Sequence, residues 1–206
     1  MIATSPRQKT PQPWDFCGAI LSGGESRRMG VPKAGMLLPD GRSMIERTRD
    51  MLKSFCRNVV IVGAPYGLNG HQVIEDSEKN LGPLGGLEAL LGSGVASQYI
   101  VVPCDLPLAP AAFISRLSRD KGTSGMTTFQ VEGEEHPRPL PCRISSEHLE
   151  DIRMLLKRGE RSIRGLMKQL NDKVENTHVA SRERELLLNV NTPEEFERAC
   201  TVLRRS

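Results

Sequence analysis

Short apolar runs recur through the first half of the chain and end at glycine or polar residues. Residues 16–21 form one such run, which stops at a pair of glycines. A run of this length that leads into a loop is typical of a buried parallel strand. Residues 59–62, 72–74 and 99–102 have the same strand-like character. We therefore expect strands at these four places.

Between these runs, apolar residues recur at helical spacing. The residues that follow Ser43 predict a helix with one buried face, made of Met44, Ile45, Thr48, Met51, Leu52 and Phe55. Ser43 and Glu46 form a capping box, in which each side chain binds a free backbone amide at the helix start. Pro83 stands near the first turn of a second expected helix, over residues 83–91.

The second half of the chain continues this alternation. Residues 126–131 and 140–144 are strand-like and flank the polar residues 132–135, which predicts a small hairpin insertion. At the C-terminus, residues 192–195 predict the start of a last helix, with Thr192 as the cap, Pro193 in the first turn and Glu195 completing a capping box. We also expect helices near 110–117, over 147–158 and over 163–170, and a late strand over 186–191.

Strands that alternate with helices at this spacing predict an α/β fold with a mainly parallel sheet and helices on both faces. No break in composition divides the chain, so we expect a single domain over residues 15–206. Residues 1–14 contain three prolines and no apolar run, and they are expected to form a flexible tail.

Composition excludes several classes of protein. With 38% hydrophobic, 26% charged and 4% aromatic residues, the chain is an ordinary globular protein. It has no sustained basic run and few aromatic side chains, which argues against nucleic-acid binding. No stretch approaches the roughly 18 apolar residues of a membrane span. Residues 1–60 hold ten Lys and Arg against five Asp and Glu, so an anionic ligand is expected to dock there.

The cysteine pattern indicates a reducing environment. The five cysteines are odd in number, widely spaced and free of any C-x-x-C pair: Cys17, Cys56, Cys104, Cys142 and Cys200. This pattern predicts neither a disulfide framework nor a zinc site. We therefore expect a cytoplasmic protein.

The loop that follows the first strand is the most informative segment. Residues 21–33 combine two adjacent glycines with two arginines and a lysine. Glycines let backbone amides approach an anion, and Arg and Lys neutralise phosphate charge, so a polyphosphate could lie at this end of the strand. The loop matches neither the Walker A pattern nor the dinucleotide fingerprint. A solvated turn is the alternative for a glycine pair alone.

Three motifs carry a resemblance that runs from about residue 17 to residue 198. The loop contains Leu21-Ser22-Gly23-Gly24, then Arg28-Met29-Gly30, then Lys33, and this string resembles the signature of nucleotidyltransferases built on a Rossmann-like sheet of the nucleotide-diphospho-sugar transferase type. Residues 73–76 and 82–87 resemble the elements of that family that line the nucleotide. Residues 189–195, Asn-Val-Asn-Thr-Pro-Glu-Glu, resemble its C-terminal signature and are the most specific of the three.

Asp105 is the candidate metal ligand. It follows an apolar strand, so its carboxylate should emerge at the same sheet edge as the loop 21–33. Mg²⁺ prefers oxygen ligands and commonly takes one or two carboxylates together with substrate phosphates. The alternative is that Asp105 only caps the helix after Pro110. The family resemblance assigns the metal to this aspartate.

Asp76 is the candidate for base or ribose recognition. Its carboxylate can accept hydrogen bonds from the ring N–H and amino group of guanine or from a ribose hydroxyl, and the sequence does not choose between them. The alternative is a surface turn residue.

The resemblance implies a reaction and a set of site residues. Glycine at position 23 resembles the guanylyl-transferring branch, known from the enzyme that joins GMP to molybdenum cofactor, and implies GTP, molybdopterin-bound molybdenum cofactor and Mg²⁺. Cofactor-delivery proteins and molybdoenzyme chaperones are implied partners. The implied catalytic residues are Arg28, Lys33 and Asp105. The implied nucleotide-binding residues are Leu21, Ser22, Gly23, Gly24, Lys33, Asp76, Gly82, Pro83, Asn189 and Asn191.

Two departures from the family pattern leave alternatives open. Pro32 stands where the guanylyltransferases usually have aspartate, and residues 63–65 lack an asparagine that the family often offers to the nucleotide. A cytidylyltransferase or sugar-phosphate nucleotidyltransferase is therefore the rival within the class, and a non-catalytic nucleotide-binding adaptor is the rival outside it.

The histidines carry no ligand spacing, and we expect His148 on an exposed helix face. Residues 136–140 lie where the family carries a segment near its acceptor substrate, so the resemblance implies a binding role there.

Overall fold

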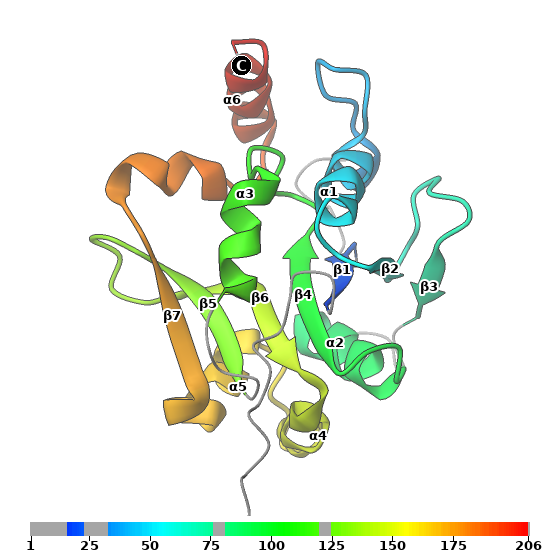
Figure 1. Cartoon of the computed structure of the whole chain (residues 1–206), viewed down its shortest axis with the longest axis vertical. Coiled ribbons are helices and arrows are strands. Elements are labelled where there is room, and N and C mark those ends of the chain that lie inside the picture. The colour runs from blue at the N-terminus through cyan, green and yellow to red at the C-terminus, as the bar shows by residue number, and fades with distance from the viewer. Residues whose placement is uncertain (1–15, 23–32, 76–80, 120–124, 206) are drawn as a thin grey trace, which may run out of the picture.

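The computed structural model of the protein describes residues 16–22, 33–75, 81–119 and 125–205. Within them, one seven-stranded sheet has the order β3-β2-β1-β4-β6-β5-β7, with β3 and β7 at its two edges (Figure 1). The strands are β1 (Cys17–Leu21), β2 (Asn58–Val62), β3 (Gln72–Ile74), β4 (Gln98–Pro103), β5 (Met126–Val131), β6 (Arg138–Ser145) and β7 (Val174–Val179).

The sheet is mainly parallel, as predicted. Strand β1 pairs in parallel with β2 and β4, β2 pairs in parallel with β3, and β5 pairs in parallel with β7. Strand β6 runs against both β4 and β5. The expected hairpin is therefore present as β5 and β6, and its strands extend the main sheet. The carboxyl ends of β1 and β4 meet at one edge, where open α/β sheets bind their ligands.

Helices cover both faces of the sheet. They are α1 (Met44–Lys53), α2 (Gly82–Gly92), α3 (Ala111–Ile114), α4 (Leu149–Lys157), α5 (Ile163–Leu170) and α6 (Pro193–Leu203). Successive residues of a strand face opposite sides, so each strand contributes to two cores. Ile20 and Ile100 pack with α1 and α3, whereas Ala19 and Val101 pack with α2, α4 and α5.

The last helix lies beyond the edge of the sheet toward which the β4 arrow points (Figure 1). Ala199 and Cys200 of α6 share a small buried cluster with Met44 at the start of α1 and with Val190. This contact brings the C-terminal segment of the chain to the carboxyl ends of the central strands.

Both predicted capping boxes are confirmed. Ser43 accepts from the backbone N–H of Glu46, whose carboxylate accepts from the N–H of Ser43. Thr192 and Glu195 make the same reciprocal pair at α6, with a proline in the first turn. These boxes bind amides that a helix start otherwise leaves unpaired.

The strand expected over residues 186–191 is wrong. Residues Ser181–Leu187 form a 3-10 helix, η6, and the chain then runs extended without joining the sheet. The apolar run exists because Leu187 is buried in the core, and a short apolar run does not distinguish a strand from a helical turn. The strand of this region is β7, whose polar sequence at the sheet edge gave no apolar signal.

His148 is buried, with Nδ1 3.0 Å from Asp151 Oδ2, so its expected exposure is wrong. All five cysteines are free, which agrees with the expectation of no disulfide framework, and each of them is buried. Burial raises the pKa of the Cys142 thiol to about 12. The expected tail, residues 1–14, lies outside the described residues. Among the described residues, no helix has the length and apolar character needed to cross a membrane.

Candidate active site

Lys33 and Asp105 meet at the sheet edge where the sequence predicted them. Lys33 begins a short 3-10 helix, η2 (Lys33–Gly35), and Asp105 follows the end of β4. Lys33 Nζ donates to Asp105 Oδ2 at 2.6 Å and to Asn191 Oδ1 at 2.9 Å. The side chains are 22% exposed for Lys33 and 10% for Asp105. The carboxylate of Asp105 therefore binds Lys33 and does not cap the helix after Pro110. The N-cap residue of α3 is Pro110, and no side chain makes a capping hydrogen bond there.

The two asparagines reach this pair from one extended segment. Asn189 Nδ2 donates to the second oxygen of Asp105, Oδ1, at 3.4 Å. Between the asparagines, Val190 is buried, and its N–H donates to the backbone carbonyl of Asp105 at 2.9 Å. In an extended chain, residues i and i+2 point to the same side. The spacing Asn-Val-Asn therefore anchors the apolar residue and presents both amides to Asp105 and Lys33. We call Lys33, Asp105, Asn189 and Asn191 the Lys33 cluster.

The capping box of α6 holds Asn191 in place. Glu195 Oε2 accepts from the backbone N–H of Asn191 at 2.7 Å and from that of Thr192 at 3.0 Å. The start of α6 is therefore coupled to the position of the amide that accepts from Lys33. The helix cap alone explains Thr192 and Glu195, and the Lys33 cluster accounts for the two asparagines.

Leu21 and Ser22 tie the strand ends together. Ser22 Oγ donates to the carbonyls of Ala64 at 2.6 Å and Val62 at 3.1 Å, and this side chain is buried. The carbonyl of Leu21 accepts from the N–H of Cys104 at 3.1 Å, next to Asp105. In this structure, these two residues hold β1 against the ends of β2 and β4.

Gly82 and Pro83 lie at the start of α2. The hydrogen bonds described above for the Lys33 cluster involve neither residue. Gly82 has φ of +65°, and a Cβ atom there would lie 3.1 Å from the carbonyl oxygen of Arg161. Glycine is therefore required by backbone conformation and by the close approach of the α4–α5 connection.

Four predicted site residues, Gly23, Gly24, Arg28 and Asp76, lie outside the described residues. Their roles stay predictions.

The Lys33 cluster offers a cation only oxygen ligands. Asp105 contributes one carboxylate, and each asparagine contributes an amide oxygen. No group of three or more His, Cys, Asp and Glu side chains that could hold a metal occurs within residues 16–22, 33–75, 81–119 and 125–205. A donor set of one carboxylate fits Mg²⁺ that is bound jointly with substrate phosphates, and it does not fit a closed structural metal site.

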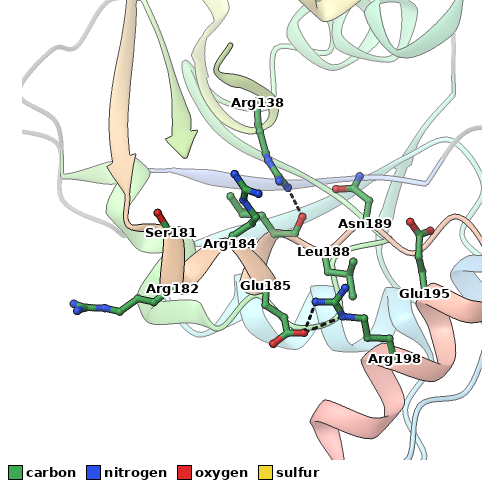
Figure 2. A pocket seen from close by; sticks show the side chains of 10 residues that line it. Arg138, Ser181, Arg182, Arg184, Glu185, Leu188, Asn189, Glu195 and Arg198 are labelled. Atoms are coloured by element: carbon green, nitrogen blue, oxygen red, sulfur yellow. Dashed lines mark hydrogen bonds and ion pairs between the residues drawn. The ribbon is translucent and has the colours of Figure 1, made fainter. Parts of the chain in front are cut away.

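A pocket of about 450 Å³ adjoins the Lys33 cluster (Figure 2). Asn189 belongs to both. We call it the arginine pocket, because four arginines from β6, η6 and α6 line it. The lining residues are Arg138, Ser181, Arg182, Arg184, Glu185, Leu187, Leu188, Asn189, Glu195 and Arg198. Of these lining residues, the family resemblance implies binding roles for Asn189 and for the segment that contains Arg138, and the other three arginines follow no motif.

Comparison with known proteins identifies the family of the chain. Residues 18–174 match the model of the MobA-like NTP transferase domain. A protein of Shewanella sediminis named molybdenum cofactor guanylyltransferase is 30% identical over 181 residues, which covers 85% of this chain and 91% of the relative. A Xanthomonas euvesicatoria protein of the same name is 32% identical over 192 residues, which covers 91% of this chain and 94% of the relative.

Solved structures show the same fold. Molybdopterin-guanine dinucleotide biosynthesis protein A from Archaeoglobus fulgidus superposes with a TM-score of 0.75 at 19% identity, covering 93% of this chain and all of that chain. A 4-diphosphocytidyl-2C-methyl-D-erythritol synthase from Anaerococcus prevotii superposes with a TM-score of 0.70 at 11% identity, covering 93% of this chain and 97% of that chain. The chain belongs to the MobA-like NTP transferase family and is a nucleotidyltransferase.

Proposed function

We propose that the protein transfers GMP from GTP to the terminal phosphate of molybdopterin-bound molybdenum cofactor, giving molybdopterin guanine dinucleotide and pyrophosphate. The observation that carries the proposal is the meeting of Lys33, Asp105, Asn189 and Asn191 at the carboxyl ends of β1 and β4. The names of the relatives from Shewanella and Xanthomonas support GTP and molybdenum cofactor as the substrates.

The proposed step is a single in-line displacement. An oxygen of the acceptor's terminal phosphate forms a bond to the α-phosphorus of GTP. The bond from that phosphorus to the oxygen that bridges to the β-phosphate breaks, and pyrophosphate leaves with the bonding electron pair. The product contains a new phosphate–phosphate link, and no covalent enzyme intermediate forms. Such a reaction depends on positioning and on stabilisation of negative charge.

Lys33 supplies positive charge at a fixed point. Asp105 and Asn191 hold its ammonium group before the nucleotide arrives, through contacts of 2.6 and 2.9 Å. A donor that is already oriented needs little reorganisation when charge develops in the transition state. Arg28, predicted from the motif after β1, is proposed to add a second cation.

Asp105 is the proposed ligand of Mg²⁺, with the amide oxygens of Asn189 and Asn191 nearby. Held at this carboxylate, Mg²⁺ would supply charge neutralisation at the phosphates of the nucleotide. Asn189 orients the carboxylate through its contact with Oδ1. Delivery proteins and chaperones stay predictions from the family resemblance.

The test is pyrophosphate release with each of GTP, CTP, ATP and UTP in the presence of Mg²⁺ and molybdenum cofactor. We expect turnover with GTP well above that with the other three. A preference for CTP would overturn the base assignment and favour the cytidylyltransferase alternative. Nucleotide binding without pyrophosphate release under any condition would favour the adaptor. Thermal shift with the same four nucleotides measures nucleotide binding independently of pyrophosphate release, since a ligand at 100 times its Kd adds about 2.7 kcal/mol of stability.

A further inference from the structure

The arginine pocket adjoins the Lys33 cluster through Asn189. This side chain lines the pocket and also donates to Asp105 Oδ1 at 3.4 Å. Figure 2 shows Asn189, Arg138 and Arg184 among the side chains that line the pocket. Cavities of 300–1,000 Å³ are typical of sites for small organic molecules, and this pocket has about 450 Å³. A molecule whose reacting phosphate lies at Lys33 can therefore extend its body into the pocket.

Two guanidinium groups in the pocket share one carboxylate. Arg138 Nη2 lies 2.6 Å from Glu134 Oε1, and Arg184 Nε lies 3.5 Å from the same oxygen. Arg138 also donates to the carbonyl of Leu187, which fixes its position at the start of β6. One carboxylate balances the charge of one guanidinium group. The Arg138–Arg184 pair therefore carries an excess positive charge.

The other acidic groups of the pocket are occupied elsewhere. Glu185 Oε1 accepts from Arg198 Nε at 3.0 Å and Nη2 at 2.9 Å, across the pocket from the pair. Glu195 Oε2 accepts from two backbone amides at the start of α6. In Figure 2 the Arg182 side chain reaches away from the other arginines. The excess charge is thus located at Arg138 and Arg184.

We propose that the Arg138–Arg184 pair binds a second anionic group of the acceptor, at the end opposite its reacting phosphate. This inference rests on the proposed function and adds a property of the acceptor: it is a phosphomonoester with a second, oxygen-bearing anionic group. Guanidinium groups suit such groups because their planar donors bind two oxygens at once. For the acceptor named above, this group is the oxygen-bearing molybdenum end.

The kinetic test varies the acceptor at saturating GTP and then GTP at saturating acceptor. Arg184→Gln removes one cation of the pair, and this side chain is 51% exposed and makes one 3.5 Å contact, so the fold should tolerate the change. We expect the KM for the acceptor to rise about tenfold, as for the loss of one hydrogen bond to a charged group, while the KM for GTP and kcat stay unchanged. Arg184→Lys should restore part of the affinity.

Arg205→Gln is the matched control, because Arg205 is an exposed arginine just after α6 and outside the pocket. It makes the same change of charge and should leave both KM values unchanged. An Arg184→Gln variant that matches Arg205→Gln in its KM for the acceptor would overturn the proposal. So would an equal rise in the KM for GTP.

A second readout does not depend on turnover. Inorganic sulfate is titrated by thermal shift in the Lys33→Ala background, which removes the cation of the Lys33 cluster. We expect sulfate to stabilise this protein and its Arg205→Gln derivative more than its Arg184→Gln derivative. Equal shifts in all three would overturn the anion site. A wild-type protein that binds sulfate at Arg184 but transfers no nucleotide to any acceptor would instead overturn the proposed function and, with it, the assignment of the pocket to the acceptor.

Discussion

The Lys33 cluster and the arginine pocket share Asn189 but differ in how their charges are held. In the Lys33 cluster, the side chains of Lys33 and Asp105 are 22% and 10% exposed, and Val190 anchors the asparagines to the backbone of Asp105. In the pocket, the guanidinium groups of Arg184 and Arg198 belong to side chains that are 51% and 62% exposed. Their carboxylate partners, Glu134 and Glu185, are 24% and 42% exposed, so these ion pairs are accessible to solvent.

This difference in exposure suits the Lys33 cluster to catalysis and the arginine pocket to ligand binding. A reacting group must be in place before charge develops, so it benefits from a partly buried hydrogen-bond network. Exposed ion pairs contribute little to stability, about 0–1 kcal/mol, and break at low cost when a ligand arrives. We therefore interpret the Lys33 cluster as the preorganised reaction centre and the arginine pocket as an adaptable binding surface.

The largest effect is expected from removing the central cation. Lys33→Ala should lower kcat/KM for GTP by about 10²–10³-fold, as loss of one preorganised donor does in other enzymes. The measurement is steady-state pyrophosphate release, with thermal melting to check the fold. Lys53→Ala, at the exposed end of α1, is the matched control and should leave turnover unchanged. Normal turnover by the Lys33 variant would remove this residue from the reaction centre.

Removal of the carboxylate should change the metal dependence. Chelation with EDTA is expected to stop turnover, and Mg²⁺ should restore it. Asp105→Asn keeps the shape of the side chain but loses its charge, so it should need a higher Mg²⁺ concentration for half-maximal rate and reach a lower maximum. An unchanged Mg²⁺ titration curve in this variant would count against Asp105 as the ligand.

The two capping boxes allow a test with a smaller expected effect on turnover, in which one box serves as the control for the other. Glu46→Ala at α1 and Glu195→Ala at α6 each remove one half of a box, and each should cost about 1 kcal/mol of unfolding free energy. Only Glu195 also holds the N–H of Asn191, at 2.7 Å. We expect turnover to fall several-fold in the Glu195 variant alone. Equal activity in the two variants would show that the position of Asn191 does not depend on the cap.

The smallest effect concerns an ion pair beside the arginine pocket. Hydrogen bonds from Arg138 lower the pKa of Glu134 below its ordinary value of 4.5. Because the pKa is lowered in the folded state, the stabilisation is complete above pH 4.5 and is lost as pH falls below it. The melting temperature of the wild type should therefore drop slightly more between pH 5 and pH 3 than that of Glu134→Gln. Added salt should reduce this difference in part, because the side chains of Arg138 and Glu134 are 25% and 24% exposed and salt screens a partly accessible pair.

Most of the fold could be predicted because local patterns determine it. The apolar runs of β1, β2 and β4 and the boxes at Ser43 and Thr192 each have a local physical cause, and all appear in the structure. Strand β7 could not be predicted this way, because it lies at the sheet edge, its residues are mostly polar and only Val179 is buried. The late apolar run was misassigned because a core residue, Leu187, can be buried from a 3-10 turn as well as from a strand.

In the site, too, some features could be predicted from local sequence and others depend on the fold. Lys33, Asp105 and the two asparagines stand at sheet-edge positions or in recognisable motifs, so the sequence could identify them. Their mutual contacts span up to 158 residues of chain, and only the folded structure reveals that Asn191 accepts a hydrogen bond from Lys33. Arg184 belongs to no sequence motif. The pair that it forms with Arg138 depends on the fold, which brings η6 to the start of β6 so that both side chains contact Glu134.

The most direct test of the reaction centre is a crystal structure with Mg²⁺ and a GTP analogue whose α,β-bridging oxygen is replaced by a methylene group. We expect a phosphate oxygen within about 3 Å of Lys33 Nζ and the metal bound to the carboxylate of Asp105. A triphosphate that binds elsewhere, and leaves the Lys33–Asp105 contact without any phosphate or metal beside it, would contradict the account.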